Sequence, residues 1–309
     1  MMDLRTLKTR LPMAALHAAR GLRGGNPLRM RWPLSGVHRH EPVLVLGCGR
    51  SGNTLMRTML NASGQVAIPP ESYVWPRAHR LFVTTPHRDW AGLAAAIVDL
   101  FTQYPEFPTW DIDLAPTREQ AMDLPEERRS LADILALVHD AYRVAHYPDA
   151  VRWGDKTPIN ALYAHRLHPV LPAAHIVHMR RDPVDAVASY VRAGLLDPSA
   201  ALAFWRAAET RLMALRSHVP HRVVTVQYED LVRDPETELR RVCDVLGIDF
   251  SPSMLHPEDH RGHAGDVVRR DHHGAVRTAI SDRSVGTGGE LLSARWVRRI
   301  RRVEHRVHG

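Results

Sequence analysis

The stretch Val43–Leu60 contains the residues of this chain best suited to chemistry on an anion. An apolar run leads into a glycine-rich turn, Gly47-Cys-Gly-Arg-Ser-Gly-Asn-Thr54, and an amphipathic helical pattern follows. Such a turn directs backbone N–H groups and the positive end of a helix dipole at one small volume. That arrangement suits a phosphate or a sulfate.

The turn has the spacing of a phosphate-binding GxxxxGK[ST] loop, with one departure from it. Asn53 occupies the position of the lysine, and Arg50 supplies a cation earlier in the turn. A nucleotide kinase or ATPase needs that lysine to reach the β- and γ-phosphates. The departure therefore favours a phosphate ligand that is not a triphosphate.

The segment His178–Tyr190 also offers cations and a hydroxyl to an anion. Arg181 follows an apolar run, and Asp182 with Pro183 has the pattern of a helix N-cap and a first helical residue. Ser189 then lies about two turns into the predicted helix. An arginine at a strand end can bind a phosphate bidentately, although beside Asp-Pro it is more often a capping or salt-bridge residue.

Lys156 and Glu71 are the remaining candidates for work on a transferred group. Lys156 lies in a predicted turn before a helix, where its compact charge could follow a moving phosphate oxygen. Glu71 lies 21 residues after Arg50 and could return to the loop as a general base. Taken singly, the first also fits a solvated loop lysine and the second an ordinary acid at a helix start.

Apolar patterning predicts an α/β fold, with a mostly parallel central sheet and helices on both faces. Strands are predicted at 42–47, 174–179 and 222–228. Helices are predicted at 53–62, 90–102, 129–146, 184–193, 199–217 and 235–246, with a docked terminal helix around Trp296–Val307. Three candidate segments directly follow strands, and open α/β sheets bind ligands at the carboxyl ends of their strands.

The formal charge of +7 over 309 residues is concentrated at the two ends of the chain. Residues 1–40 carry +7 and residues 294–309 carry +5, so residues 41–293 carry −5. A nucleic-acid-binding protein would want a basic face on its folded core, so this distribution argues against that partner. Two cysteines are too few for a disulfide scaffold and indicate a reducing compartment.

A single domain is expected over residues 41–309, with variable cap or loop segments at 103–128 and 255–290. The basic segment 1–40 fits a solvated leader, a transit peptide or an amphipathic helix on an anionic membrane surface. No apolar run approaches the roughly 18–20 residues of a membrane span. A cytoplasmic location is expected, with peripheral membrane contact through the leader left open.

The 20 histidines raise the question of a metal site, above all in His256–His263 and the pair His272-His273. Zinc ligands are usually rigid and held at helical or knuckle spacing, whereas this stretch is rich in Gly, Pro and charge. A solvated loop is the better interpretation, and no metal is expected. Cys48 lies inside the phosphate-type turn, but no histidine is fixed beside it, so a structural role is expected.

Together these segments resemble the sulfotransferases that use 3′-phosphoadenosine 5′-phosphosulfate (PAPS), over roughly residues 42–255. The Gly47–Thr54 turn looks like their 5′-phosphosulfate loop, and the stretch from Arg181 to Ser189 looks like their 3′-phosphate motif. Tyr228-Glu-Asp-Leu is similar to a stretch that recurs in the superfamily. The Glu71 spacing and the Gly-Asp-Lys-Thr-Pro element resemble the bacterial and protein-tyrosine branches.

The resemblance implies a three-layer fold like that of P-loop NTPases and transfer of a sulfuryl group, in line and without a metal, to a hydroxyl or amine. Glu71 would take the acceptor proton, and Arg50 and Lys156 would stabilise the departing phosphate. The nucleotide contacts it implies come from Arg50, Ser51, Gly52, Asn53, Thr54, Arg181, Ser189 and Tyr228, with Arg277, Thr278 and Ser281 as further candidates.

Two positions depart from the family pattern. Asn53 replaces a threonine or glycine, and Ser284–Gly289 is similar to a Ser-Val-Gly-Arg-Trp element but lacks its Arg-Trp. Two alternatives stay open: a P-loop-type small-molecule kinase or NTPase, and a catalytically inactive nucleotide-binding protein of the same fold. The acceptor also stays open among a carbohydrate, a glycolipid, a small hydroxylated metabolite and a peptide tyrosine.

Overall fold

A five-stranded parallel sheet lies at the centre of the computed structural model, which describes residues 30–37, 40–259 and 280–309. The strand order is β2-β3-β1-β4-β5, and each neighbouring pair is parallel. The strands are β1 (Val43–Gly47), β2 (Val66–Ala67), β3 (Arg152–Asp155), β4 (His175–Arg180) and β5 (Val223–Gln227). Because all run the same way, their carboxyl ends meet at one edge, where the predicted site residues follow them.

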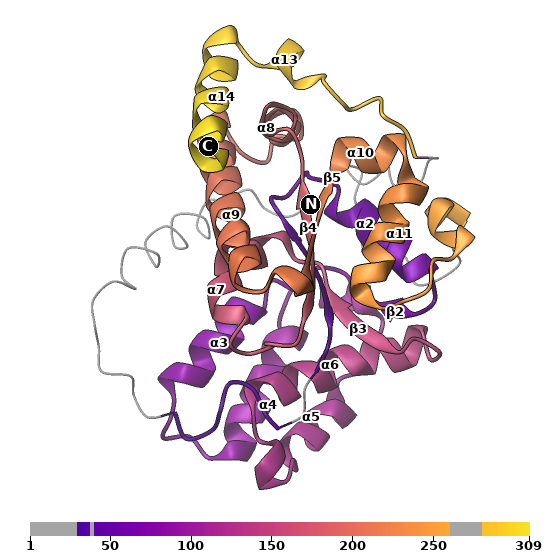
Figure 1. The fold of residues 1–309 in the computed structure, drawn as a ribbon. Coiled ribbons are helices and arrows are strands. Elements are labelled where there is room, and N and C mark those ends of the chain that lie inside the picture. The colour runs from indigo at the N-terminus through magenta and orange to yellow at the C-terminus, as the bar shows by residue number, and fades with distance from the viewer. Residues whose placement is uncertain (1–29, 38–39, 260–279) are drawn as a thin grey trace.

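Helices cover both faces of the sheet, which gives three layers (Figure 1). Successive side chains of β1 point to opposite faces: Val43 and Val45 join one buried cluster, and Leu44 and Leu46 join the other. The first face carries α2 (Asn53–Ala62), α10 (Tyr228–Arg233) and α11 (Pro235–Leu246). The second carries α6 (Leu131–His146), α7 (Ala164–Leu167), α8 (Pro183–Arg192) and α9 (Pro198–His218). The predicted α/β fold is confirmed.

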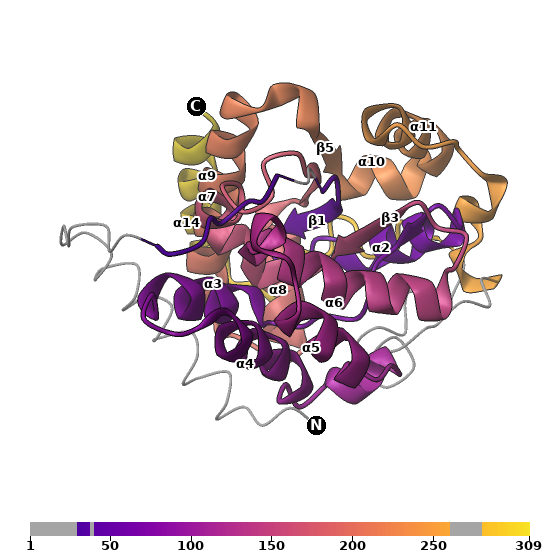
Figure 2. The ribbon, with the colours of Figure 1, turned by 90° about the horizontal axis from the view of Figure 1, so that it is seen from below.

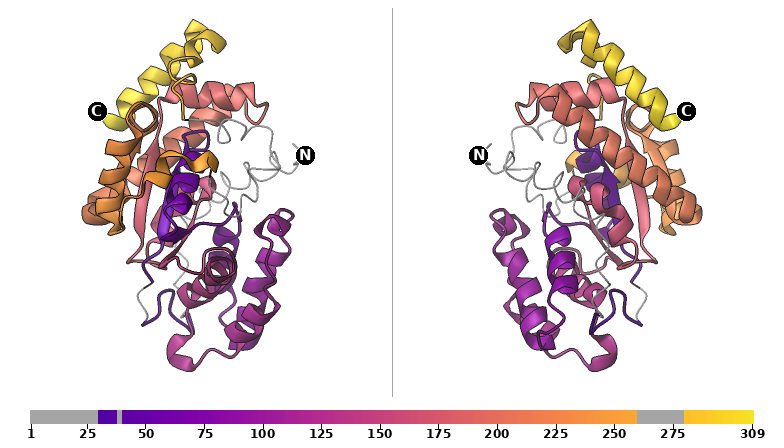
Figure 3. Two further views of the ribbon diagram at one scale, coloured as in Figure 1. Left: turned by 90° about the vertical axis from the view of Figure 1, so that its right-hand side faces the viewer. Right: turned by 90° about the vertical axis from the view of Figure 1, so that its left-hand side faces the viewer.

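A helical cap extends the second face at the end of the molecule away from α14 (Figures 1 and 3). It consists of α3 (Trp75–Thr84), α4 (Trp90–Thr102), the 3-10 turns η1 (Phe107–Trp110) and η2 (Glu126–Arg128), α5 (Ala115–Met122) and part of α6. Figure 2 views it from below. Residues 30–37 of the predicted leader are described, and Trp32 packs edge-on against Trp90 with only 7% exposure.

The C-terminal segment crosses the carboxyl edge of the sheet. From Ile280 it passes α10 and α8 (yellow in Figure 1), forms the short α13 (Gly288–Leu291) and ends in α14 (Ala294–His308). Ile300 of α14 is fully buried, and Trp296, Val303 and Val307 pack against the same core cluster. The predicted docked terminal helix is therefore confirmed. No helix among the described residues is both long and apolar enough to cross a membrane.

The predicted helices 53–62, 90–102 and 235–246 coincide with α2, α4 and α11, and the other three end within two residues of α6, α8 and α9. Two strands, β2 and β3, were not predicted, nor were α3, α5 and α10. Strand β3 has the sequence Arg-Trp-Gly-Asp, which lacks the apolar run of a buried strand. Lys156 consequently follows a strand directly, ahead of the 3-10 helix η3 (Pro158–Tyr163). The remaining 3-10 turns are η4 (Pro220–Arg222), η5 (Pro252–Leu255) and η6 (Pro257–Asp259).

Candidate active site

The turn between β1 and α2 is built on two left-handed residues. Gly52, at the N-cap of α2, has φ 84°, and a side chain there would collide with the Tyr228 ring, 2.5 Å from the Cβ position. Arg50 has φ 68°, a conformation that costs an ordinary residue about 1–2 kcal/mol. No side chain of the described residues caps α2 at this N-cap, so its dipole and first-turn N–H groups face the loop.

Side chains inside the turn divide between holding its shape and facing a ligand. Asn53 Nδ2 donates to the Cys48 carbonyl at 2.8 Å, so this departure from the family pattern locks the loop internally. Thr54 Oγ1 accepts a hydrogen bond from Lys156 Nζ at 3.2 Å. Ser51 Oγ is buried and, within the described part of the chain, has no hydrogen-bond partner.

Lys156 and Glu71 form a buried ion pair beside this turn. Lys156 Nζ lies 2.6 Å from Glu71 Oε1, and the two residues are 1% and 5% exposed. The interpretation of Lys156 as a solvated loop lysine is therefore wrong. Removing one partner of a buried pair would leave an uncompensated charge, so neither residue can be replaced alone without a loss of stability. We call Thr54, Glu71 and Lys156 the base side of the site.

A buried polar network surrounds the base side. Asp155, fully buried, accepts hydrogen bonds from Thr157 Oγ1 at 3.0 Å and from Asn160 Nδ2 at 2.7 Å. Burial nevertheless raises the pKa of Asp155 to about 6. His139 Nε2 lies 4.0 Å from Asp155 Oδ2, and burial lowers the pKa of that imidazole to about 4. The sequence analysis missed this network, although the Gly-Asp-Lys-Thr-Pro element contains half of it.

Two arginines meet at the other end of the turn. Arg50 Nε donates to Ser189 Oγ at 3.1 Å, and Arg181 Nη1 donates to the Arg50 carbonyl at 3.0 Å. The Arg181 guanidinium stacks over the Tyr228 ring at 4.5 Å. Arg181 Nε is buried and has no hydrogen-bond partner among the described residues. Asp182 caps α8 by accepting from Val184 N at 2.8 Å, as predicted.

The segment Ser284–Gly288 closes over these arginines. The Ser284 carbonyl accepts from Arg181 Nη2 at 2.7 Å, and Ser284 Oγ lies 2.9 Å from the Tyr228 hydroxyl. The two carboxylate oxygens of Asp185 accept from Gly286 N and Gly288 N, both at 2.7 Å. We call Arg50, Arg181, Ser189, Tyr228 and Ser284 the arginine side. Ser284 and Asp185 were not predicted as site residues; their signal was the Ser284–Gly289 element itself.

Tyr190 is a further residue that the sequence analysis missed. Its hydroxyl is hydrogen-bonded to the Cys48 thiol, and a Cβ on Gly49 would lie only 2.0 Å from that hydroxyl. Burial raises the pKa of both groups, so the thiol and the phenol stay protonated at neutral pH. This environment fits the structural role expected for Cys48, because a reactive cysteine needs its thiolate form.

These contacts link the turn between β1 and α2 with five other predicted residues into one site. The five are Glu71, Lys156, Arg181, Ser189 and Tyr228. Ser281 is exposed and makes no hydrogen bond to another described residue. Arg277, Thr278, residues 260–263 and the pair His272-His273 lie outside the described residues. Within the part of the chain that the structure describes, no group of three or more His, Cys, Asp or Glu side chains could hold a metal ion.

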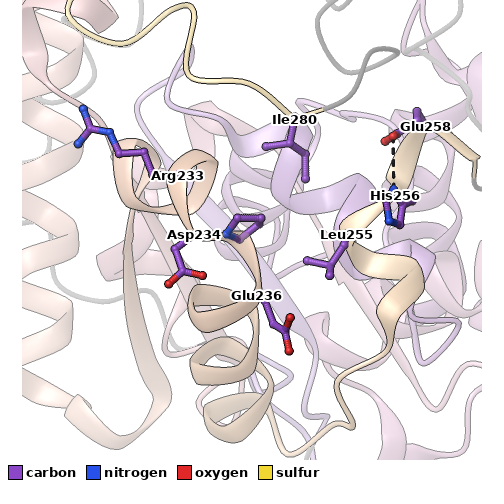
Figure 4. A pocket seen from close by; sticks show the side chains of 8 residues that line it. Arg233, Asp234, Glu236, Leu255, His256, Glu258 and Ile280 are labelled. Carbon is purple, nitrogen blue, oxygen red and sulfur yellow. Dashed lines mark ion pairs between the residues drawn. The ribbon is translucent and has the colours of Figure 1, made fainter.

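A separate open pocket of about 380 Å³ lies beside α11 and η5 (Figure 4). Leu255 and Ile280 form its apolar lining, and Asp234, Glu236 and Glu258 supply carboxylates. No residue of the base side or the arginine side lines it. The site is therefore assigned from converging buried polar groups and not from cavity size.

A sequence model described as the sulfotransferase family matches residues 42–252. A candidate protein-tyrosine sulfotransferase of Caenorhabditis briggsae is 21% identical over 272 residues, which cover 84% of this chain and 84% of that protein. The sulfotransferase domain of the Synechococcus PCC 7002 olefin synthase superimposes with a TM-score of 0.61 at 24% identity, over 90% of this chain and 98% of that domain. The sulfotransferase domain from the curacin biosynthetic pathway gives a TM-score of 0.52 at 20% identity, over 87% and 97%. These two structures support the fold alone.

Proposed function

Because this chain belongs to the sulfotransferase family, we propose that it moves a sulfuryl group from PAPS to a hydroxyl or amine of its acceptor, with Glu71 as general base. The observation that carries the proposal is a set of buried donors that lack acceptors. Ser51 Oγ and Arg181 Nε have no partner among the described residues, and α2 begins without a side-chain cap. Leaving a buried donor unsatisfied costs about 1–3 kcal/mol, which a ligand rich in phosphate and sulfate oxygens would recover.

In the proposed reaction the acceptor oxygen or nitrogen attacks the sulfur while the bond from sulfur to the bridging phosphate oxygen breaks. Negative charge develops on that bridging oxygen, and the cations of Arg50 and Lys156 with the N-terminus of α2 stabilise it. The acceptor proton passes to Glu71. The products are a sulfated acceptor and 3′-phosphoadenosine 5′-phosphate (PAP).

Lys156 links the two halves of this chemistry. One ammonium group contacts both the proposed base, Glu71, and the hydroxyl of Thr54 in the phosphate-type turn. Its charge favours the ionised form of a neighbouring carboxylate, which is the form able to accept a proton. The base and the leaving phosphate are therefore expected to share one cation.

The arginine side is proposed to bind the 3′-phosphate of PAPS. On this side Arg181 Nε is a buried donor that has no acceptor among the described residues. Ser189 Oγ adds a hydroxyl beside Arg50. Tyr228, stacked under Arg181, is proposed to contact the nucleoside. A ribose 3′-phosphate separates PAPS from ATP, so this side would set the choice of nucleotide. No metal is required in this proposal, because arginine and lysine supply the positive charge.

The test of the proposed function is Glu71→Gln, with the exposed Glu290→Gln as a matched control. Transfer of labelled sulfate from PAPS would be measured to water, a phenol, a tyrosine peptide, an oligosaccharide and a hydroxylated lipid. Loss of a general base should lower transfer at least about a hundredfold, while PAP affinity should stay within about twofold.

Normal turnover by Glu71→Gln would remove Glu71 from the role of base. A melting temperature raised by ATP with magnesium, and not by PAP, would favour the kinase alternative. PAP binding without transfer to any of these acceptors would favour an inactive nucleotide-binding protein.

A further inference from the structure

Thr157 connects the proposed base to the lysine through a second, independent link. Its Oγ1 accepts a hydrogen bond from Ser72 N at 3.3 Å and donates to Asp155 Oδ2 at 3.0 Å. Ser72 follows Glu71 in the chain, and Thr157 follows Lys156. The hydroxyl therefore links the side chain of Thr157 to the backbone of Ser72, one residue beyond the 2.6 Å ion pair between Lys156 and Glu71.

The network that orients this hydroxyl is fully buried. Asp155, Thr157 and Asn160 have no solvent exposure, and Ser72 has 2%. Because Asp155 Oδ1 accepts from Asn160 Nδ2 and its Oδ2 accepts from Thr157, the threonine proton is committed to the carboxylate. The lone pairs of Thr157 Oγ1 are thus directed toward the peptide that follows Glu71.

The segment around Glu71 has an irregular backbone. It lies in the connection between β2 and α3, where Glu71 and Ser72 belong to no helix or strand. Asp155, by contrast, ends β3 and is paired with Leu44 of β1 in the sheet. A hydrogen bond from the connection to a strand-anchored group transfers the rigidity of the sheet to the position of the base.

We propose that Thr157, oriented by Asp155, is a positioning residue that sets the distance between Glu71 and Lys156 and therefore the efficiency of proton removal. This inference rests on the proposed role of Glu71. The charged and titratable groups that act on Glu71 in this site are Lys156 and Asp155 at the end of β3, Arg50 in the turn and Tyr190 on α8.

The test compares Thr157→Val, which has the same shape without a hydroxyl, with Thr157→Ser, which restores one. The matched control is Thr109→Val in η1, another buried threonine, whose Oγ1 donates to the Glu106 carbonyl at 2.7 Å. Labelled-sulfate release from PAPS to water would report kcat, KM and their pH dependence, and calorimetry would report PAP affinity.

Thr157→Val is expected to lower kcat about tenfold with KM for PAPS and PAP affinity within about twofold. The acidic limb of its kcat profile should move to higher pH, because a looser lysine contact favours the ionised carboxylate less. Thr157→Ser should restore both quantities, and Thr109→Val should leave both unchanged.

Wild-type kcat and an unmoved acidic limb in Thr157→Val, with Glu71→Gln inactive, would overturn this inference and leave the proposed function intact. The inference would also be overturned if Thr157→Val lost kcat only in proportion to a lowered melting temperature and Thr109→Val showed the same proportion. An active Glu71→Gln would instead overturn the proposed function on which the inference rests.

Discussion

The two sides of the site are held together by different kinds of contact. On the base side, side chains bond to side chains: Lys156 to Glu71 and Thr54, and Thr157 and Asn160 to Asp155. The arginine side also has side-chain contacts, Arg50 to Ser189 and Tyr228 to Ser284. Its central residue, Arg181, donates instead to two backbone carbonyls, those of Arg50 and Ser284. The base side thus depends on ionisable partners, whereas the arginine side depends on the path of the backbone.

This difference follows from where each side lies in the fold. Glu71 and Lys156 of the base side lie in buried segments that follow β2 and β3, where a charge requires a partner. The arginine side is closed by Ser284–Gly288, which reaches the site from the C-terminal end of the chain. The base side should therefore respond strongly to charge changes and to pH, and the arginine side to changes in hydrogen-bond geometry.

The largest effect is expected for Lys156→Met. It leaves the Glu71 carboxylate buried without its ammonium partner, which should lower the free energy of unfolding by about 3–5 kcal/mol and abolish transfer. Urea denaturation measures the first and labelled-sulfate transfer the second. The double variant Glu71→Gln/Lys156→Met should recover most of the stability and none of the activity. A double variant no more stable than Lys156→Met would show that the ion pair does not hold this side together.

The next largest effect is expected on the pH dependence of stability in Asp155→Asn. Burial raises the pKa of Asp155 from 3.8 to about 6, so between about pH 4 and pH 6 the folded protein keeps a proton that the unfolded chain has lost. Asp155 therefore lowers stability as pH rises through that window, by roughly 3 kcal/mol at most. The asparagine variant, which does not ionise, should gain stability relative to wild type over the same window.

His139 also changes the stability of the protein with pH, so the effect of Asp155 has to be measured as a difference between variant and wild type. Burial lowers its pKa from 6.5 to about 4, so the unfolded chain takes up a proton first as pH falls. Its contribution to stability is present above about pH 6.5 and is lost toward pH 4, opposite in sign to that of Asp155. Urea unfolding at several pH values would be compared as a difference between variant and wild type. Parallel stability curves would contradict the assignment to Asp155.

The smallest of the three effects is expected for Arg181→Lys. A lysine keeps the charge but cannot present the planar fork that contacts both the Arg50 and the Ser284 carbonyls. PAP affinity should fall about tenfold, independent of pH between 5 and 8, which calorimetry measures. The control is the neighbouring Arg180→Lys, since Arg180 pairs with Glu209 outside the site. Equal affinities for the two variants would remove Arg181 from nucleotide binding.

The sequence predicted the parts of the site that follow regular patterns. Apolar runs, the glycine-rich turn and the Asp-Pro cap located β1, α2, β4 and α8. Thr54 and Ser189 lie in two of these helices, and Arg50 and Arg181 lie in the turns that precede them. The base side was harder to predict, because the polar sequence of β3 lacks the apolar pattern of a buried strand. The role of Asp155 becomes clear only when its hydrogen-bond partners are known. His139, which lies 4.0 Å from Asp155, belongs to α6 and not to the segment around β3.

The closing segment escaped prediction for another reason. Ser284 accepts from Arg181 through its carbonyl oxygen, and a residue of any type would offer the same group. The sequence interpretation named Arg277, Thr278 and Ser281 as candidates, and the first two lie outside the described residues. A contact made by the main chain leaves little trace in the amino-acid types, so the path of the chain has to be seen to find it.

The left-handed backbone of Arg50 sets folding against function at a single position. Selection for stability alone would place a glycine there, because glycine adopts φ 68° without the penalty that an arginine bears. The Cβ atom makes this conformation costly, and the same side chain carries the guanidinium that reaches Ser189. An arginine at this torsion gives up stability that a glycine would keep, so the strained backbone of Arg50 supports the role proposed for its side chain.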